Sequence, residues 1–178
     1  QAFPSMPIYF WNDDEGEKYL KAYFSEFKNV WHHGDFISIN QRGGIKIFGR
    51  SDATLNPGGV RIGTSEIYQV VENMAEIEDS VIIGHKVNDD EEVVLFIKLN
   101  YGKQLNNELI DNIKLNIRSN CSPRHVPAKI FRVPAIPYTI NGKKVELAVK
   151  RTIHGEEITN KEALANPESL EFFKSFKI

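Results

Sequence analysis

The sequence lacks the features that mark several large classes of protein. Its single cysteine, Cys121, excludes an internal disulfide and is typical of a reducing, cytoplasmic compartment. The formal net charge is only −2, so we expect neither nucleic acid nor an anionic membrane as a partner. No apolar run approaches the length of a membrane span, and the first residues are not expected to form a signal peptide.

Other absences narrow the choice further. We find no internal repeat, no low-complexity segment and no Gly-rich phosphate-binding loop. His and Cys residues are not clustered at metal-ligand spacing, so no metal site is predicted. The 178 residues predict one domain or one and a half. The start at Gln1, without an initiator methionine, leads us to expect a piece of a longer chain.

Hydrophobic periodicity predicts an alternation of helices and strands. Apolar residues recur at helical spacing in the segments 17–28, 64–74, 109–117 and 145–153. Short apolar runs predict strands at 36–39, 45–48, 80–85, 93–99 and 128–133. Thr64 or Ser65 is expected to cap the second helix and Gly155 to end the last one. Asn166, Pro167 and Glu168 predict the start of a short helix.

This order of elements predicts the fold class and the division of the chain. Residues 52–155 are expected to form a compact two-layer α+β domain with three helices and four strands, the first of which is predicted to begin at about residue 53. Residues 1–51 are rich in aromatic side chains, and we interpret them as the end of a larger preceding domain that includes a β-hairpin. Residues 156–178 are expected to be a tail with a short helix.

The most informative motif lies in residues 137–144, near the end of the predicted domain, and we call this segment the lysine loop. Pro137 ends the preceding segment, and Asn141-Gly142 is a turn dipeptide. The turn places Lys143 at the tip of a mobile loop, just before a helical segment. A lysine there can reach a phosphate or carboxylate in another module. A solvated loop lysine is the alternative, and for an isolated Asn-Gly-Lys it would be preferred.

Several weak motifs occur in a fixed order along the chain. His33-Gly34-Asp35 is followed by Gly49-Arg50-Ser51-Asp52, then by a Gly-Gly-Val-Arg-Ile-Gly-Thr stretch from Gly58, and then by the lysine loop. This order resembles the C-terminal part of the adenylate-forming superfamily, which comprises acyl-CoA synthetases, peptide-synthetase adenylation domains and luciferases. Within it, the chain is most similar to the acetoacetyl-CoA synthetase family, through residues 10–13, 49–57, 122–127 and 136–146.

The resemblance implies a reaction in two steps. ATP and a carboxylic acid, here acetoacetate, give an acyl-adenylate and pyrophosphate; coenzyme A then attacks the acyl carbon and AMP leaves. The small C-terminal domain rotates between the steps. The partner is the enzyme's own N-terminal domain, which is expected to hold the acyl pocket. Mg²⁺ is expected to accompany ATP and not to be bound by this chain, and the chain alone is expected to be inactive.

Four residues correspond to nucleotide contacts of the superfamily. Lys143 matches the catalytic adenylation lysine, which bridges substrate carboxylate and α-phosphate; Lys144 is the neighbouring alternative. Asp35 matches an aspartate that holds the ribose hydroxyls, Arg50 an arginine at the ribose and phosphate, and Arg61 an arginine near the phosphate. The alternatives are a loop aspartate, an arginine that closes the hairpin and a solvated arginine.

Three residues correspond to the hinge and to coenzyme A contacts. Asp52 matches the hinge residue, although Ala53 stands where many relatives have a second acidic residue. Gly59 matches a glycine of the pantetheine tunnel, and Arg118 an arginine at the 3′-phosphate of coenzyme A. Turn geometry and a helix-end cation are the alternatives. No role is predicted for Arg124 and His125.

Two other functions remain open at this point. The chain could belong to a ligase for another short acyl group such as acetate, because the acyl pocket is expected to lie elsewhere. It could also be a stand-alone, non-catalytic module with the same fold.

Overall fold

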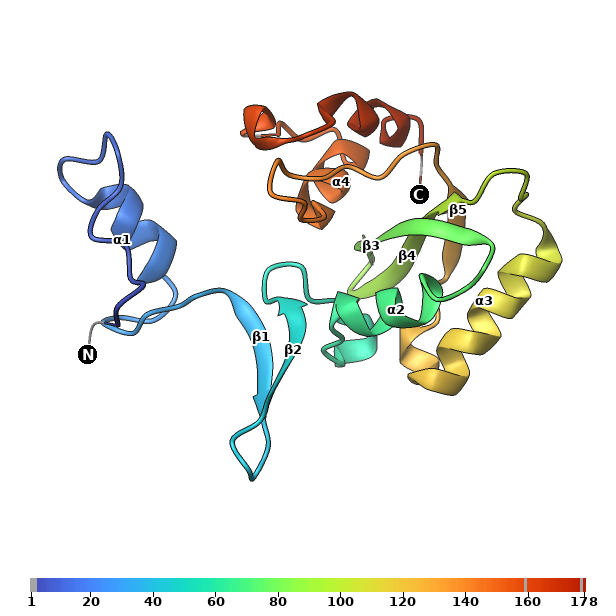
Figure 1. Ribbon diagram of the computed structural model, residues 1–178, viewed down its shortest axis with the longest axis horizontal. Coiled ribbons are helices and arrows are strands. Elements are labelled where there is room, and N and C mark those ends of the chain that lie inside the picture. Colours follow the sequence, from blue (N-terminus) through green and yellow to red (C-terminus); the bar gives the residue numbers. More distant parts are fainter. Residues whose placement is uncertain (1–2, 159, 177) are drawn as a thin grey trace. The chain divides into compact units, whose positions relative to one another are not determined.

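A computed structural model describes residues 3–158, 160–176 and 178. The chain divides into two compact units, one up to Gly34 and one from Asp35 onward (Figure 1). In this described part, no helix has the length and apolar character needed to cross a membrane. The boundary between these two units lies at Gly34 and is a different one from the predicted functional boundary at Asp52, which remains a prediction.

The first unit is a small aromatic cluster around helix α1 (Glu17–Tyr23). The carboxylate of Asp13 accepts hydrogen bonds from the backbone N–H groups of Lys18 and Tyr19, each at 2.9 Å, and so holds the start of the helix. The Tyr23 ring stacks on Trp31 at a centroid distance of 3.8 Å. The helix is shorter than predicted: it ends at Tyr23, whose carbonyl oxygen accepts a hydrogen bond from the N–H of His32.

The second unit is built on a three-stranded sheet in the order β3–β4–β5. Strands β3 (Ile77–Val87) and β4 (Asp90–Leu99) form an antiparallel hairpin, and β5 (Lys129–Arg132) pairs with β4 in parallel. A parallel neighbour requires a crossover, and helix α3 (Asn107–Asn120) lies in it. A separate hairpin, β1 (Asp35–Ile39) and β2 (Ile45–Arg50), confirms the predicted pair of strands.

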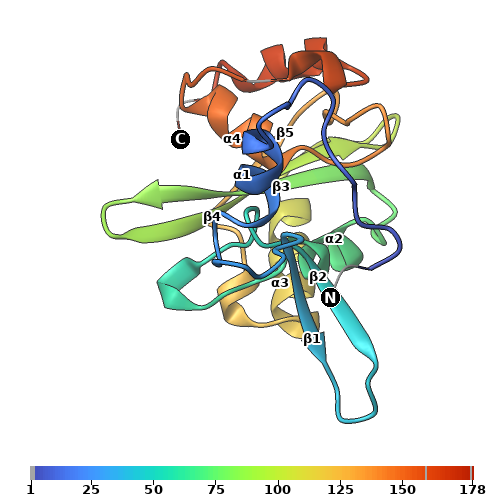
Figure 2. The same ribbon diagram turned by 90° about the vertical axis from the view of Figure 1, so that its left-hand side faces the viewer.

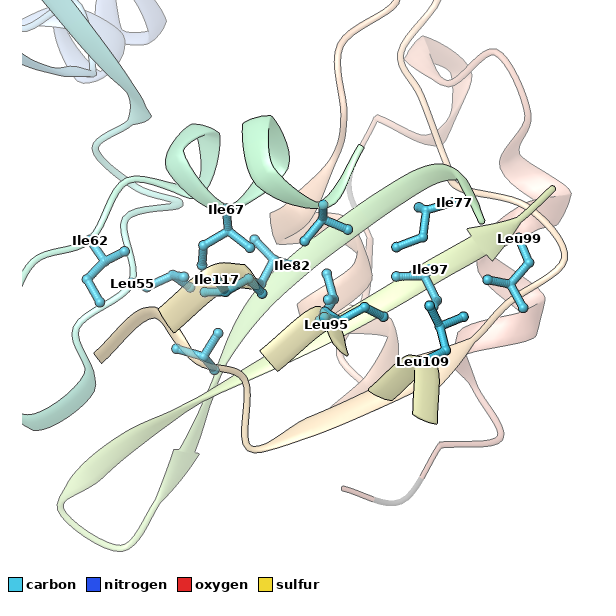
Figure 3. Close-up of a cluster of buried hydrophobic side chains, with 13 residues drawn as sticks. Leu55, Ile62, Ile67, Ile77, Ile82, Leu95, Ile97, Leu99, Leu109 and Ile117 are labelled. Carbon is cyan, nitrogen blue, oxygen red and sulfur yellow. The ribbon is translucent and has the colours of Figure 1, made fainter. Parts of the chain in front are cut away.

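Alternate residues of the central strands enter two separate hydrophobic cores. On one face, Ile82, Leu95 and Ile97 pack with helices α2 (Thr64–Val71) and α3 (Figure 3). On the other face, residues such as Val94 and Phe96 pack with helix α4 (Glu146–Ile153) and with the 3₁₀ helix Pro167–Phe173.

The α+β class predicted from the sequence is confirmed, and the sheet is covered on both faces. Figures 1 and 2 show α4 and the C-terminal segment on one side of the sheet and α2 and α3 on the other. The second face needs this cover because Val94 and Phe96 are as apolar as their neighbours; Phe173 is fully buried against them. The structure therefore has a third layer, formed by α4 and the tail, in addition to the two that were predicted.

Three local predictions need correction. The first predicted strand of the domain is reduced to one bridge, Leu55 to Ile62. Neither Thr64 nor Ser65 caps α2: the helix is preceded by Gly63, and the Ser65 hydroxyl instead donates to the carbonyl oxygen of Phe48 at 2.9 Å. The short helix after Asn166 is present, but the Asn166 side chain does not cap it.

Candidate functional site

The lysine loop is a tight, hydrogen-bonded turn. Tyr138 and Lys144 pair across its base, and the Thr139 N–H donates to the Lys143 carbonyl at 2.8 Å. The Gly142 N–H donates to the Thr139 carbonyl at 2.8 Å, with Gly142 at a φ of 71°, where glycine is strongly favoured. The Lys143 N–H donates to the Thr139 hydroxyl at 3.0 Å. The turn predicted from Asn141-Gly142 is therefore present, and it exposes Lys143 at the tip.

The C-terminal tail is hydrogen-bonded to this loop. The Ile140 N–H donates to the Ala163 carbonyl at 2.9 Å, and the Ala165 N–H donates to the Tyr138 carbonyl at 2.8 Å. The Asn166 side chain accepts from the Tyr138 N–H at 2.8 Å and donates to the Ile136 carbonyl at 2.9 Å. The loop is thus hydrogen-bonded to the tail, a contact that the sequence did not indicate.

A cavity of about 380 Å³ lies beside the loop. Its wall is formed by the end of the β1–β2 hairpin, by α4 and by the tail. The charged side chains at the cavity are Arg50, Lys143, Lys144 and Arg151, with Asp52 and Glu146. This excess of cations suits an anionic ligand. Three residues predicted from the sequence, Arg50, Asp52 and Lys143, line the same cavity.

Arg50 links this cavity to Asp35. Its Nε lies 3.4 Å from Asp52 Oδ1, and its Nη1 lies 3.8 Å from Asp35 Oδ1. Asp35 and Arg50 are also direct partners in the β1–β2 ladder, which explains why a 15-residue separation brings them together. All three side chains are at least one-third exposed, so these ion pairs are worth about 0–1 kcal/mol and can be exchanged for a ligand.

The two adjacent lysines of the loop have opposite environments. The ammonium of Lys144 is largely buried and binds the carboxylates of Glu72 and Asp79. Lys143 is exposed, and within the described part of the chain its ammonium has no hydrogen bond or ion pair. Of the two candidates from the sequence, Lys143 is therefore the one that a ligand can engage without breaking an existing ion pair.

Glu146 forms the polar floor beneath the loop. The Tyr68 hydroxyl donates to Glu146 Oε1 at 3.0 Å, and it accepts from the Ile82 N–H at 3.2 Å. Burial raises the pKa of Glu146, and the charge of Asp52 adds to this; the Tyr68 hydrogen bond and Lys144 act in the opposite direction. Burial likewise raises the pKa of Tyr68 well above its ordinary value. Sequence reasoning did not identify this pair, because the partners are 78 residues apart.

Gly59, Arg61 and Arg118 do not line the cavity with Lys143. Gly59 lies in the 3₁₀ turn Pro57–Gly59 with a φ of 76°, and a Cβ there would meet nothing within 4 Å. Arg61 is exposed on the segment that follows. Arg118 is exposed in the last turn of α3, which packs on the sheet face opposite α4.

Arg124, for which the sequence predicted no role, lies in this second region. Its guanidinium packs against Gly58, where a Cβ would come within 1.9 Å of Nη1. The Gly58 N–H donates to Asp90 Oδ1 at 2.7 Å. Arg124 belongs to the 3₁₀ turn Pro123–His125, which follows α3 and packs against it. The end of α3 and the glycine turn are thereby connected, a contact that no local sequence pattern indicates.

Comparison with known proteins gives a consistent result. No family model matches the chain. It is 58% identical over 173 residues to the acetoacetyl-coenzyme A synthetase of Rhizobium meliloti (strain 1021), covering 97% of this chain and 27% of that protein. It is 51% identical over 177 residues to the acetoacetyl-CoA synthetase of Danio rerio, covering 98% of this chain and 26% of that protein.

A solved structure also resembles the chain. The acetoacetyl-CoA synthetase from Streptomyces lividans superposes with a TM-score of 0.90 and 42% identity, over 97% of this chain and 26% of that one. The chain spans about a quarter of the length of the relatives it matches. The resemblance inferred from the motifs, to the C-terminal portion of these synthetases, is therefore confirmed.

Proposed function

We propose that this chain is the C-terminal portion of an ATP-dependent acetoacetate–CoA ligase. In the first step, a carboxylate oxygen of acetoacetate attacks the α-phosphorus of ATP, and pyrophosphate leaves. In the second step, the sulfur of coenzyme A attacks the acyl carbon of acetoacetyl-AMP, and AMP leaves. The similarity to acetoacetyl-CoA synthetases over 97% of the chain supports this reaction.

The observation that carries the proposal is the position of Lys143 at a cation-rich cavity. Its ammonium is exposed, and Arg50 and Arg151 line the same cavity. Negative charge builds between the attacking carboxylate and the α-phosphate as pyrophosphate departs. A preorganised ammonium at this point stabilises the transition state more than the bound substrates, which is the requirement for catalysis.

Asp35 and Arg50 are suited to hold the nucleotide. A carboxylate can accept hydrogen bonds from both ribose hydroxyls, and a guanidinium fork can bind a phosphate with two parallel hydrogen bonds. The Arg50–Asp35 and Arg50–Asp52 ion pairs are long and partly exposed, so breaking these two contacts costs a nucleotide little. We include Arg61 as a further phosphate contact. Its side chain is exposed, and it follows the β1–β2 hairpin closely in the sequence.

The second step is assigned to the other region, with Asp52 as the hinge between the two arrangements. The open backbone at Gly59 leaves room for the pantetheine chain, and Arg118 supplies a cation for the 3′-phosphate of coenzyme A. Because these residues do not share a cavity with Lys143, a rotation at Asp52 would present each set in turn.

The remaining parts of the proposal concern partners and setting. ATP and coenzyme A bind as substrates, with Mg²⁺ carried by ATP. The acyl pocket and the other half of the nucleotide site belong to the larger N-terminal domain. A reducing, cytoplasmic setting is supported by the lone, partly buried Cys121, whose pKa is raised mainly by burial and is therefore unlike that of a reactive thiol.

The test is acetoacetate-dependent exchange of pyrophosphate into ATP by the complete enzyme. Replacing Lys143 with Ala should lower this exchange by about 100-fold or more, as does removing one preorganised electrostatic donor. Lys103→Ala is a matched control, because Lys103 is also exposed directly after a glycine with positive φ but lies away from the cavity. Its exchange rate should match wild type.

Two results would contradict the proposal. Wild-type exchange by Lys143→Ala would remove the assigned role of that lysine. Faster exchange with acetate than with acetoacetate would replace the substrate by another short acyl group while leaving the reaction class intact.

A further inference from the structure

Lys144 is held by three different acceptors. Its Nζ donates to Glu72 Oε1 at 2.7 Å, to the Ser80 carbonyl at 2.5 Å and to the carboxylate of Asp79. An ammonium has three N–H donors, so each has a partner. The ammonium also lies over the ring of Tyr68, 4.7 Å from its centroid. Only 16% of the side chain is exposed, which makes this lysine a fixed part of the fold.

Tyr138, on the other side of the loop, reaches the same carboxylate. Its hydroxyl lies 2.9 and 2.8 Å from the two oxygens of Asp79. Tyr138 and Lys144 are also paired across the base of the loop. The segment before the turn and the segment after it are therefore both hydrogen-bonded to Asp79 of β3.

A bulge in β3 brings Asp79 into this position. The register with β4 shifts between Ile77 and Asp79, so Glu78 is an extra residue. Without the bulge, Asp79 would be in phase with Ile77, which enters the core beneath α2 and α3. With it, Asp79 is in phase with Val81, which enters the core beneath α4 and the tail. β3 is an edge strand, and Lys144 occupies its free Ser80 carbonyl.

The anchor is ionic under working conditions. Burial lowers the pKa of Lys144, but the hydrogen bonds that its ammonium donates to Asp79 and Glu72 outweigh this and leave the pKa raised. Glu72 is held in turn by the Ser80 hydroxyl at 2.7 Å. Loss of either partner of such a pair leaves an uncompensated, largely buried charge, so the arrangement resists displacement.

We propose that Lys144, Tyr138 and Asp79 form a positioning unit that fixes Lys143 for the adenylation step. The inference rests on the proposed function. Lys144 touches no reacting atom; it acts through the backbone of its neighbour. An error of about 1 Å in the place of a catalytic group can cost about 100-fold in rate. Lys144, whose Nζ is anchored, directly follows Lys143, the residue that must reach the α-phosphate.

The experiment measures the two half-reactions separately in the complete enzyme. Tyr138→Phe removes one hydroxyl and retains the ring, and Lys144→Met removes the charge and retains most of the volume. Each should lower pyrophosphate exchange by about 10- to 100-fold, mainly in kcat, since the group acts on position. Thioester formation from preformed acetoacetyl-AMP should stay within about twofold of wild type. Lys144→Arg, which keeps the charge, should recover part of the lost exchange.

The control is Lys129→Met. Lys129 forms an ion pair with Glu92 in the neighbouring strand, and within the described residues no hydrogen bond or ion pair joins it to Tyr138, Lys144 or Asp79. It should leave both half-reactions at wild-type rates. Thermal unfolding of every variant distinguishes a displaced loop from an unfolded domain, and Tyr138→Phe decides the matter if Lys144→Met does not fold.

Equal losses in both half-reactions, or wild-type exchange in Tyr138→Phe, would overturn the positioning role. Lys143→Ala in the same series keeps the two proposals distinguishable. If Lys143→Ala lowers exchange and Tyr138→Phe does not, only the positioning unit is refuted. If Lys143→Ala exchanges normally, the proposed function itself fails.

Discussion

The cavity beside Lys143 and the region around Gly59 differ in how they offer a ligand its contacts. The cavity presents charged side chains, Arg50, Lys143 and Arg151, on a floor that contains the partly buried Glu146. The Gly59 region presents open backbone and the Arg124 guanidinium packed on Gly58, and the last turn of α3 separately presents Arg118. One set suits developing charge at a phosphate, and the other suits a long, thin substrate that ends in a phosphate. A single domain can thus carry two kinds of site if it can turn.

The largest effect is expected from blocking the proposed rotation of the domain at Asp52. Asp52→Pro fixes φ near −65° and should lower one half-reaction by about 100-fold relative to the other, because only one arrangement remains accessible. Asp52→Ala is the matched control, since it removes the carboxylate but leaves the backbone free. Rapid-quench measurement of each half-reaction checks both variants. Equal losses in Asp52→Pro and Asp52→Ala would mean that the side chain matters and the hinge lies elsewhere.

An intermediate effect, on the KM for coenzyme A, is expected from a substitution at the end of α3. Arg118→Glu should raise the KM for coenzyme A by about tenfold, in keeping with the loss of one hydrogen bond to a charged group. The KM for ATP should not change. Lys114→Glu, one turn earlier on α3, makes the same charge change and should have little effect.

Dephospho-coenzyme A, which lacks the 3′-phosphate, sharpens this test. Wild type and Arg118→Glu should use it with nearly equal KM. A difference as large as that seen with coenzyme A would reduce Arg118 to a cation that complements the helix dipole.

The smallest effects are expected from two carboxylates whose pKa values shift in opposite directions. Burial raises the pKa of Glu146, so its contribution to stability is greatest below the unfolded pKa and is lost as pH rises through the folded one. Hydrogen bonds from the N–H groups of Gly58 and Glu91 lower the pKa of Asp90, so its contribution is present above the unfolded pKa and is lost as pH falls.

Thermal unfolding at neutral and acid pH distinguishes the two. Glu146→Gln should be slightly more stable than wild type at neutral pH, with the difference vanishing once Glu146 is protonated. Asp90→Asn should be slightly less stable at neutral pH, and its difference should also vanish in acid. Shifts of the same sign at neutral pH would show that the two regions do not differ in this respect.

Much of the framework could be predicted from the sequence because it depends on local patterns. The supports of the turn that exposes Lys143 could not be predicted. Asp79 is in position only because Glu78 is an extra residue in the strand, and the pairing of Ile140 with Ala163 joins segments with no shared pattern.

The same limit applies to the candidate site. Arg50 and Asp52 line the cavity with Lys143. The resemblance implied a nucleotide contact for Arg50 and a hinge at Asp52, and both roles remain predictions. Arg124 and Glu146 were not identified, because their relevant contacts are with Gly58 and Tyr68, far away in the sequence. Packing decides such contacts, and periodicity carries no information about them.

The most direct test of the central claim compares two variants in both half-reactions. The matched pair is Lys143→Ala in the cavity and Gly59→Leu in the other region. A Cβ at Gly59 would meet nothing within 4 Å, so the positive φ is expected to dominate the loss of stability, at about 1–2 kcal/mol. Gly102→Leu, at a φ of 77° and equally open, controls for that cost.

Single-turnover rates of adenylate formation and of thioester formation should then show opposite patterns. Lys143→Ala should lose about 100-fold or more in the first step and little in the second. Gly59→Leu should lose about 10- to 100-fold in the second step and little in the first, while Gly102→Leu should match wild type in both. If both Lys143→Ala and Gly59→Leu slow the same step, the two regions do not serve separate half-reactions and the account is wrong.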